Sequence, residues 1–313
     1  MTGLVLRRLL ALPAVLALAA VLVFLLPRMS GVDTERAVLR SRLSEAEPDP
    51  AVLAAIRREF GLDASPVEQF LRWLGHLLTG DMGVSFATRT PVAGMVFPAL
   101  GVSVVLTALA LALAAVVGIP AGVRAARRPG GWLDRAVAGV SVLGVAVPEF
   151  VLGAVLVLVF AIAVPVLPAT GWGSAAQAVL PVLTLAAFPA ALAAQLTRAE
   201  TLDAMGRPHV AVARSKGLAE HVVLWRHGGR LALTSVTSLS GLFFGGLLGG
   251  SVVVEVVFAV PGLGRLLYDA VVGQDLPVIQ SGLLVVVAVA ATATIAAEAV
   301  QLALDPVGRS MST

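Results

Sequence analysis

Six apolar runs, separated by more polar segments, leave few folds open to this chain. A helix needs about 20 mostly apolar residues to cross the hydrocarbon core of a bilayer, and each run reaches that length. Helices also satisfy every backbone N–H and C=O within one segment, as the bilayer interior demands. The sequence therefore predicts an all-α, polytopic membrane protein with six transmembrane helices. The runs are residues 4–26, 97–123, 136–163, 177–197, 232–255 and 279–304.

Composition supports the bilayer over a soluble fold. The mean hydropathy is +0.95 and only 13% of the residues are charged, too few polar groups to cover a soluble protein of 313 residues. The net charge of +3 does not indicate nucleic acid as a partner, because the basic residues cluster beside apolar runs and aromatic stacking platforms are scarce. The absence of cysteine excludes disulfides, thiolate metal sites and a cysteine nucleophile.

The first apolar run can be read in two ways. Arg7 and Arg8 precede an uncharged stretch, Leu9–Leu26, which also fits a secretory signal peptide. The stretch is long for a signal peptide, and no small-residue cleavage site follows it cleanly. We therefore expect an uncleaved N-terminal transmembrane helix over residues 1–27.

Residues 28–95 differ from the rest of the chain. They carry 17 of its 41 charged residues, and their apolar runs are short. Within them, Asp63–Ser65 followed by Pro66 is typical of a helix start. We expect this segment to be a small extracytoplasmic unit, followed by a five-helix core over 96–308 and a short tail over 309–313.

Loop charges predict the orientation. Six spans place both termini on one side, and with the termini inside, the inner segments carry 13 basic residues and the outer ones nine. Eight of those nine lie in the 28–95 segment, where nine acids offset them, and segments that long count little in the positive-inside rule. Both termini and the loop over 198–233 are therefore expected to be cytoplasmic.

That loop contains an unusually polar stretch, RPHVAVARSKGLAEHVVLWRHGGR, over residues 207–230. Pro208 suits a first helical turn and Gly217 suits a helix end. Between them, Val210, Ala213 and Ala211 would form a small apolar face that another protein could approach closely. On composition alone, a solvated loop or an amphipathic helix on anionic lipid remains open. A metal site at His209, His221 and His227 is disfavoured, because spacings of 12 and 6 place no two of them on one helical turn.

Part of this stretch, ARSKGLAEHVVLWRH, resembles the cytoplasmic signature loop of permease subunits of ABC importers, in the variant of dipeptide, oligopeptide and nickel systems. Further blocks are similar to that family, among them GLDASPVEQFLRWLGHLLTGDMGVSF, LALAAVVGIPAGVRAA, WLDRAVAGVSVLGVAVPEFVLG, VVVEVVFAVPGLGRLLYDAVVGQDLPVIQ and EAVQLALDP. The chain departs from the general signature at Ala211, where Glu is usual, and at Ser235, where Pro is common.

The resemblance implies a type I ABC-importer permease fold in the bacterial inner membrane. It also implies that the helix ending at Gly217 is a coupling helix, which docks in a cleft of a separate ATPase. The residues expected to couple to that ATPase are Pro208, Ala211, Ala213, Arg214, Lys216, Gly217 and Leu218.

Two further regions are candidate sites. Gly241, Gly245 and Gly249 recur every four residues, a spacing that lets helices approach closely, either within the chain or at a pore-side contact between permeases. Downstream, helix-breaking residues near Glu255 suggest either an outer gate or a simple cap of the bundle. The gate candidates are Glu255, Pro261, Gly262 and Gly264.

An absent motif points to partners. The sole lysine, Lys216, lies in Ser-Lys-Gly and not in a Walker A loop, so this chain is not expected to be an enzyme or to hold a cofactor. ATP and magnesium are expected on two partner ATPase domains, beside a second permease, an extracytoplasmic binding protein and membrane lipid. The expected cargo is a peptide, with nickel, glutathione or another small solute as alternatives. A proton-coupled transporter using Glu149 or Glu298, or a membrane scaffold, is disfavoured but open.

Overall fold

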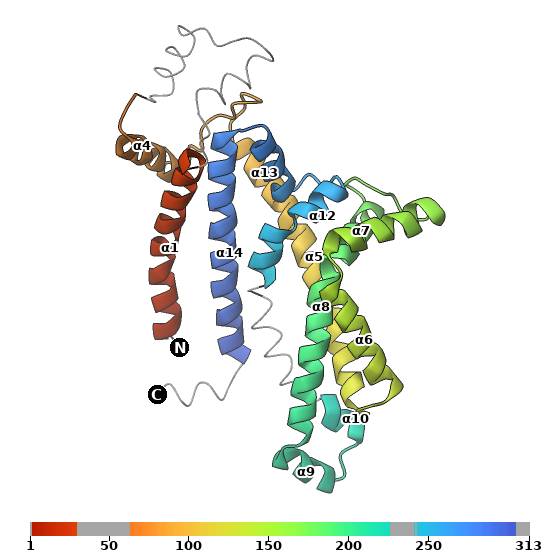
Figure 1. The fold of residues 1–313 in the computed structure, drawn as a ribbon. Helices are drawn as coiled ribbons and strands as arrows, with labels where there is room; N and C mark the ends of the chain where they lie inside the picture. The colour runs from red at the N-terminus through yellow and green to blue at the C-terminus, as the bar shows by residue number, and fades with distance from the viewer. Residues whose placement is uncertain (1, 30–62, 226–240, 242, 305–313) are drawn as a thin grey trace.

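The computed structural model describes residues 2–29, 63–225, 241 and 243–304. These ranges are helical apart from their connections and one isolated bridge between Val84 and Pro91. The all-α expectation is therefore confirmed for the described part of the chain. Figure 1 shows long helices running in one general direction, with short helices gathered at both ends.

The centre of the core is a pair of long helices, α5 (Ala93–Ala126) and α8 (Ala175–Met205). Small residues let their backbones approach closely, since Gly118 and Gly122 of α5 face the backbone of Ala190 and Ala194. Both helices contain prolines, and α8 begins with a capping box between Ser174 and Gln177. The runs predicted at 97–123 and 177–197 lie inside these two helices.

The run predicted as one span over 136–163 is broken. It forms α6 (Trp132–Ala146), α7 (Glu149–Val157) and the π-helical segment η1 (Leu158–Ala163), and the axis turns by 105° at the break. The cause is Pro148, because a residue before proline is driven out of the helical region, and Val147 is extended with φ −84° and ψ 120°. The structure describes this run as a bent pair of helices, and its role as one span stays a prediction.

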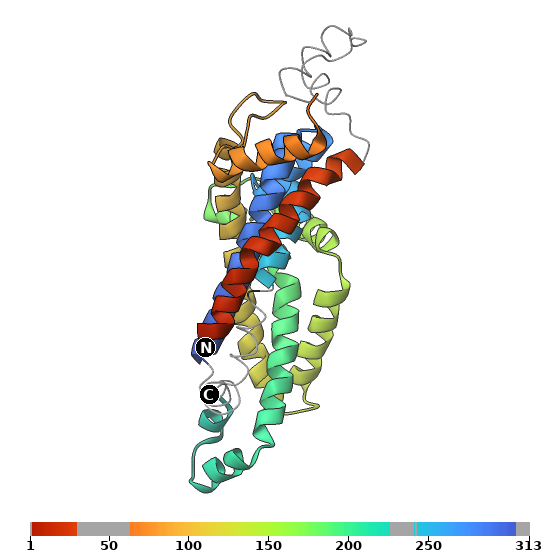
Figure 2. The ribbon, with the colours of Figure 1, turned by 90° about the vertical axis from the view of Figure 1, so that its left-hand side faces the viewer.

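Helix α1 (Thr2–Met29) packs against α14 (Leu276–Leu304), and Figure 2 shows it crossing over that helix. Two short helices, α12 (Val252–Val257) and α13 (Leu263–Val272), join the α14 side to the top of α5. At the opposite end, α9 (Pro208–Ser215) and α10 (Glu220–Val223) follow α8.

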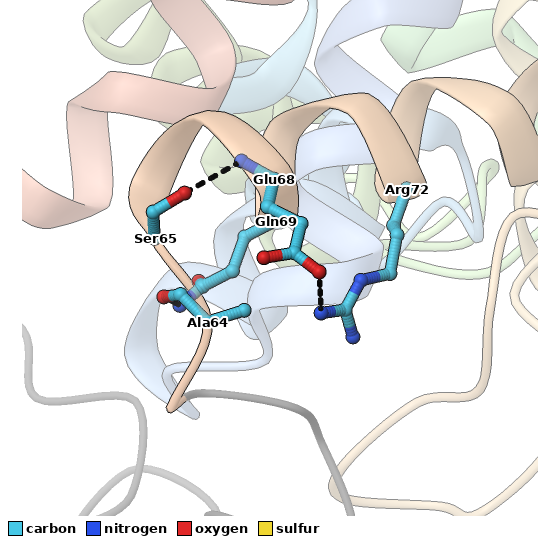
Figure 3. A network of polar contacts seen from close by, with 5 residues as sticks. All are labelled: Ala64, Ser65, Glu68, Gln69 and Arg72. Carbon is cyan, nitrogen blue, oxygen red and sulfur yellow. Dashed lines mark hydrogen bonds and ion pairs between the residues drawn. The ribbon is translucent and has the colours of Figure 1, made fainter.

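Helix α4 (Pro66–Leu78) starts where the sequence predicts. The Ser65 hydroxyl accepts a hydrogen bond from the Glu68 N–H at 3.3 Å, and Pro66 occupies the first turn (Figure 3). Arg72 then pairs with Glu68 at 2.8 Å along the helix. Phe70 and Trp73 stack on Phe24 of α1, which holds α4 across the end of that helix.

Three of the described helices, α5, α8 and α14, are long and apolar enough to cross a membrane, and the bent α6–η1 pair could be a fourth. The apolar stretch of α1 over Leu10–Leu25 is shorter than these three helices. Of the run over 232–255, residues 241, 243–250 and 252–255 are helical, and residues 232–240 and 242 lie outside the described residues. The count of six spans and the side of the termini stay predictions.

Candidate functional site

A compact helical hairpin forms the end of the molecule beyond α8. Pro208 occupies the first turn of α9, as predicted, and Gly217 ends it with a φ of +77°, a left-handed conformation that glycine adopts at no steric cost. The Gly217 N–H donates to the Arg214 carbonyl at 2.9 Å and the Leu218 N–H to the Ala213 carbonyl at 3.4 Å. These two bonds form the usual glycine-dependent helix end and turn the chain back into α10.

The apolar residues predicted to face a partner protein lie largely inside this hairpin. Val210 and Ala213 are buried, and they pack with Val223 of α10 and Met205 of α8. Only Ala211 of the predicted face is exposed. The expectation that Val210 and Ala213 face outward was wrong. The chain turns back after Gly217, and α10 covers these two side chains.

Arg214 closes the hairpin. Its guanidinium donates to both Glu220 carboxylate oxygens, at 3.2 and 2.8 Å. This bond lowers the pKa of the Glu220 carboxyl, and the charges of Arg214 and Arg127 act in the same direction. The pair therefore stabilises the hairpin above the unfolded-state pKa of that carboxyl, and its contribution is lost as the pH falls through the lowered folded-state pKa.

A different set of residues faces outward. We call it the outer hairpin face, and it comprises Ala211, Val212, Ser215, Lys216 and Leu218. Val212 and Leu218 are 52% and 41% exposed, so the surface offers two aliphatic side chains beside one cation. Sequence reasoning missed Val212, although its position two residues from the buried Val210, about 200° around the helix, places it on the opposite side.

No group of three histidine, aspartate or glutamate side chains comes together anywhere in the part of the chain that the structure describes. A metal site at His209, His221 and His227 was disfavoured from the sequence, and this stays a prediction, because His227 and the side chain of His209 lie outside what the structure describes.

The glycine stripe meets another helix of the same chain. A side chain at Gly241 would collide with Ala297 of α14, and one at Gly245 would lie 3.0 Å from the Cβ of Ala290. Gly249 is less tight, with Val286 at 4.0 Å. The described contacts of the stripe are therefore intramolecular, and its role between two permeases stays a prediction.

At the other end of the core, Glu255 joins three helices. Its carboxylate is fully buried and accepts bonds from the hydroxyls of Ser103 on α5, at 2.6 Å, and Ser251, at 2.9 Å. The other oxygen accepts the N–H of Arg265 in the first turn of α13, at 2.9 Å, where a negative charge is favoured. Glu255 thus fixes α13 to α5 and α12.

Two of the predicted gate residues, Gly262 and Gly264, leave space for the Glu255 carboxylate because they have no side chain. A Cβ on Gly262 would collide with the Glu255 carboxyl group, and one on Gly264 would lie 2.9 Å from its Oε2 and 2.8 Å from the Cα of Val252. The structure therefore brings Glu255, Gly262 and Gly264 together at one junction. An opening motion at this place stays a prediction.

A pocket of about 560 Å³ adjoins the junction between α5 and α13. Pro261 and Gly262 line it, together with apolar residues of α5 such as Met95 and Val102. Arg265 and Asp269, which pair at 3.9 Å, supply charges of both signs at its wall. The arrangement can accept a solute that carries both a cationic and an anionic group.

Asp275, which sequence reasoning did not single out, holds the 81–91 loop against α14. Its buried carboxylate accepts bonds from the Ser85 hydroxyl and from the N–H groups of Phe86, at 3.1 Å, and Ala87, at 3.4 Å. Ser281 of α14 adds a bond to the Met82 carbonyl at 3.2 Å. The loop is therefore fixed to the same end of the bundle as α13.

Replacing Asp275 with alanine is expected to release this loop. Bonds to a carboxylate are worth about 1.5–3 kcal/mol each, so amide exchange of Phe86 and Ala87 should speed up by at least about tenfold. Hydrogen exchange read by mass spectrometry measures this. Asp269→Ala, on the exposed side of α13, is the control and should leave the loop unchanged; equal exchange in both variants would show that Asp275 does not hold it.

Comparison with known proteins places these features in context. Residues 118–308 match the family model described as binding-protein-dependent transport system inner membrane component. The glutathione transport system permease protein of Escherichia coli K12 is 38% identical over 284 residues, covering 91% of each chain. A putative peptide transport system permease protein of Brucella abortus is 38% identical over 292 residues, again covering 91% of each.

Proposed function

This chain belongs to the family of binding-protein-dependent transport system inner membrane components, and on that premise we propose that it is the permease subunit of an ATP-driven importer of peptides. The outer hairpin face carries the proposal. The α9–α10 hairpin packs on itself beyond α8, and its outer face presents Val212, Leu218 and Lys216 at the surface.

In this proposal the hairpin seats in a cleft of a partner ATPase, which holds ATP and magnesium. The aliphatic side chains of Val212 and Leu218 supply the buried part of the contact, and Lys216 supplies charge at its rim. Arg214 has a supporting role, because its bond to Glu220 holds the shape of the hairpin. Two ATPase domains, a second permease and an extracytoplasmic binding protein complete the assembly, with six spans in this chain and both termini on the ATPase side.

The proposed cargo is a short peptide. The relatives are described as permeases of glutathione and peptide systems, and glutathione is itself a short peptide. Such solutes carry an ammonium and a carboxylate, and the pocket beside α13 has Arg265 and Asp269 in its wall. Nickel or another small solute is the alternative cargo.

The test uses the permease co-purified with the ATPase, second permease and binding protein, and reconstituted in liposomes. Val212→Asp combined with Leu218→Asp should reduce peptide-stimulated ATP hydrolysis and peptide uptake by at least about tenfold, because charge in the docking contact removes one or more hot spots. The control pair, Val212→Ile with Leu218→Met, should retain both activities.

Two results would overturn the proposal. One is normal coupled uptake in the aspartate pair while the complex stays assembled. The other is uptake without ATP that stops when Glu149 and Glu298 are replaced by glutamine, which would indicate a proton-coupled transporter. Competition with dipeptides, glutathione and nickel in the same assay identifies the cargo.

A further inference from the structure

A cationic pocket lies where α5 ends and α6 begins, beside α10. Its volume is about 390 Å³, and its lining includes Arg124, Arg127, Arg128, Trp132, His221 and Trp225. All three arginines are exposed, and Trp132 is 79% exposed. The Arg124 guanidinium lies 5.9 Å from the centre of the Trp225 ring, which orients it over an aromatic face.

The carboxylates described around this pocket neutralise its charge only in part: the charge of Arg127 acts on Glu220, but each carboxylate is bound by another arginine. Asp134 is bound by Arg198 of α8 and by the Gly130 N–H, and Glu220 is bound by Arg214. Among the described residues, none of the three pocket arginines forms an ion pair within 4 Å. The pocket therefore holds a local excess of positive charge available to an anion.

An apolar groove of about 720 Å³ lies on the same sides of α5 and α6. Aliphatic and small residues of α5, α6, α7 and α8 line it, among them Val117, Ala121, Val137, Val140 and Leu152. On α5 the groove residues Val117 and Ala121 are followed at helical spacing by the pocket residues Arg124 and Arg128. On α6, the groove residues Val140 and Val137 lie at helical spacing from Leu133, which lines the cationic pocket.

The apolar groove followed by a cluster of arginines matches the two parts of a phospholipid, an acyl chain and a charged headgroup. We propose that an anionic phospholipid of the leaflet on the α9–α10 side binds here, with its phosphate among Arg124, Arg127 and Arg128 and an acyl chain in the groove. Guanidinium groups bind phosphate oxygens bidentately, and tryptophans such as Trp132 favour the membrane–water interface. Three cations select a lipid of net negative charge over a zwitterionic one, whose ammonium group would meet them.

The test measures lipid retained by the purified complex, using phosphatidylglycerol and phosphatidylcholine in native mass spectrometry after detergent exchange. Arg124→Gln with Arg128→Gln should lower retained phosphatidylglycerol at least fivefold. Arg135→Gln with Arg207→Gln removes the same charge outside the pocket and should change retention less than twofold. Val140→Trp, which fills the groove, should also lower retention, whereas Val142→Trp, on the same helix but outside the groove lining, should not.

Several results would overturn the proposal. Equal loss in both arginine pairs would show a general charge effect, and equal retention of phosphatidylcholine would show that the arginines select nothing. Displacement by millimolar inorganic phosphate would identify a soluble anion as the ligand. Because the chain has no cysteine of its own, Val140→Cys can also be crosslinked selectively, and efficient bonding to a second permease would assign the groove to a protein contact.

Discussion

Gly122→Ala is expected to force α5 away from α8 and to destabilise the core by about 1–3 kcal/mol, the typical cost of overpacking a well-packed core. The added Cβ would collide with the Ala194 carbonyl and would lie 2.8 Å from the Thr197 Cβ and 2.9 Å from the Arg198 N. Most of these atoms are backbone, so rotation of a side chain cannot relieve the overlap. The unfolding midpoint of the purified chain in detergent, followed by intrinsic fluorescence, measures the effect.

Gly101→Ala is the matched control on the same helix. Nothing lies within 4 Å of the Cβ it would add, and alanine is favoured over glycine inside a helix by about 0.5–1 kcal/mol. Its midpoint should be unchanged or raised. Equal midpoints for the two variants would show that the α5–α8 contact is looser than described.

Glu255→Ala is expected to destabilise the junction of α5, α12 and α13 by about 2–5 kcal/mol. The Ser103 hydroxyl and the Arg265 N–H would lose their acceptor in a buried place, at about 1–3 kcal/mol each. Ser251 loses less, because its hydroxyl also reaches the Leu248 carbonyl at 3.3 Å. The unfolding midpoint and proteolysis within 258–265 both report the change.

Glu255→Gln separates loss of the acceptors from loss of volume. The amide keeps one oxygen as an acceptor, but its NH2 group would face one of the groups that donate to the carboxylate, such as the Arg265 N–H. This variant should therefore be destabilised by about half as much as Glu255→Ala. Asp269→Asn, on the exposed side of α13, should stay within about 0.5 kcal/mol of the parent. A Glu255→Ala chain with an unchanged midpoint would show that the junction does not depend on the carboxylate.

Local signals in the sequence predicted local structure well. The long apolar runs predicted α5, α8 and α14, because length and hydropathy are properties that can be read along the sequence alone. Ser65 with Pro66 and Pro208 with Gly217 marked the bounds of α4 and α9, since caps and glycine turns act within a few residues.

Local sequence patterns could not predict contacts between residues that are far apart in the chain. Val210 and Ala213 were assigned to a partner because the return of α10 over them depends on a tertiary turn. Glu255 was named as a gate candidate, but its donors on Ser103 and Arg265 come from other helices. The bend after α6 begins at Pro148, which is a local feature, yet its size depends on how α7 packs against α8.

The length of α8 affects how the two ends of the bundle can move relative to each other. With 31 residues it is about 46 Å long, and one end leads into the α9–α10 hairpin. Just before its other end, the Gly171 N–H donates to the Phe258 carbonyl at 2.8 Å, three residues from Glu255. A tilt of about 5° about one end of a rod of this length displaces the other by about 4 Å. The two ends of the bundle would then move together, with no separate signal passed between them and no delay beyond that of a rigid rotation.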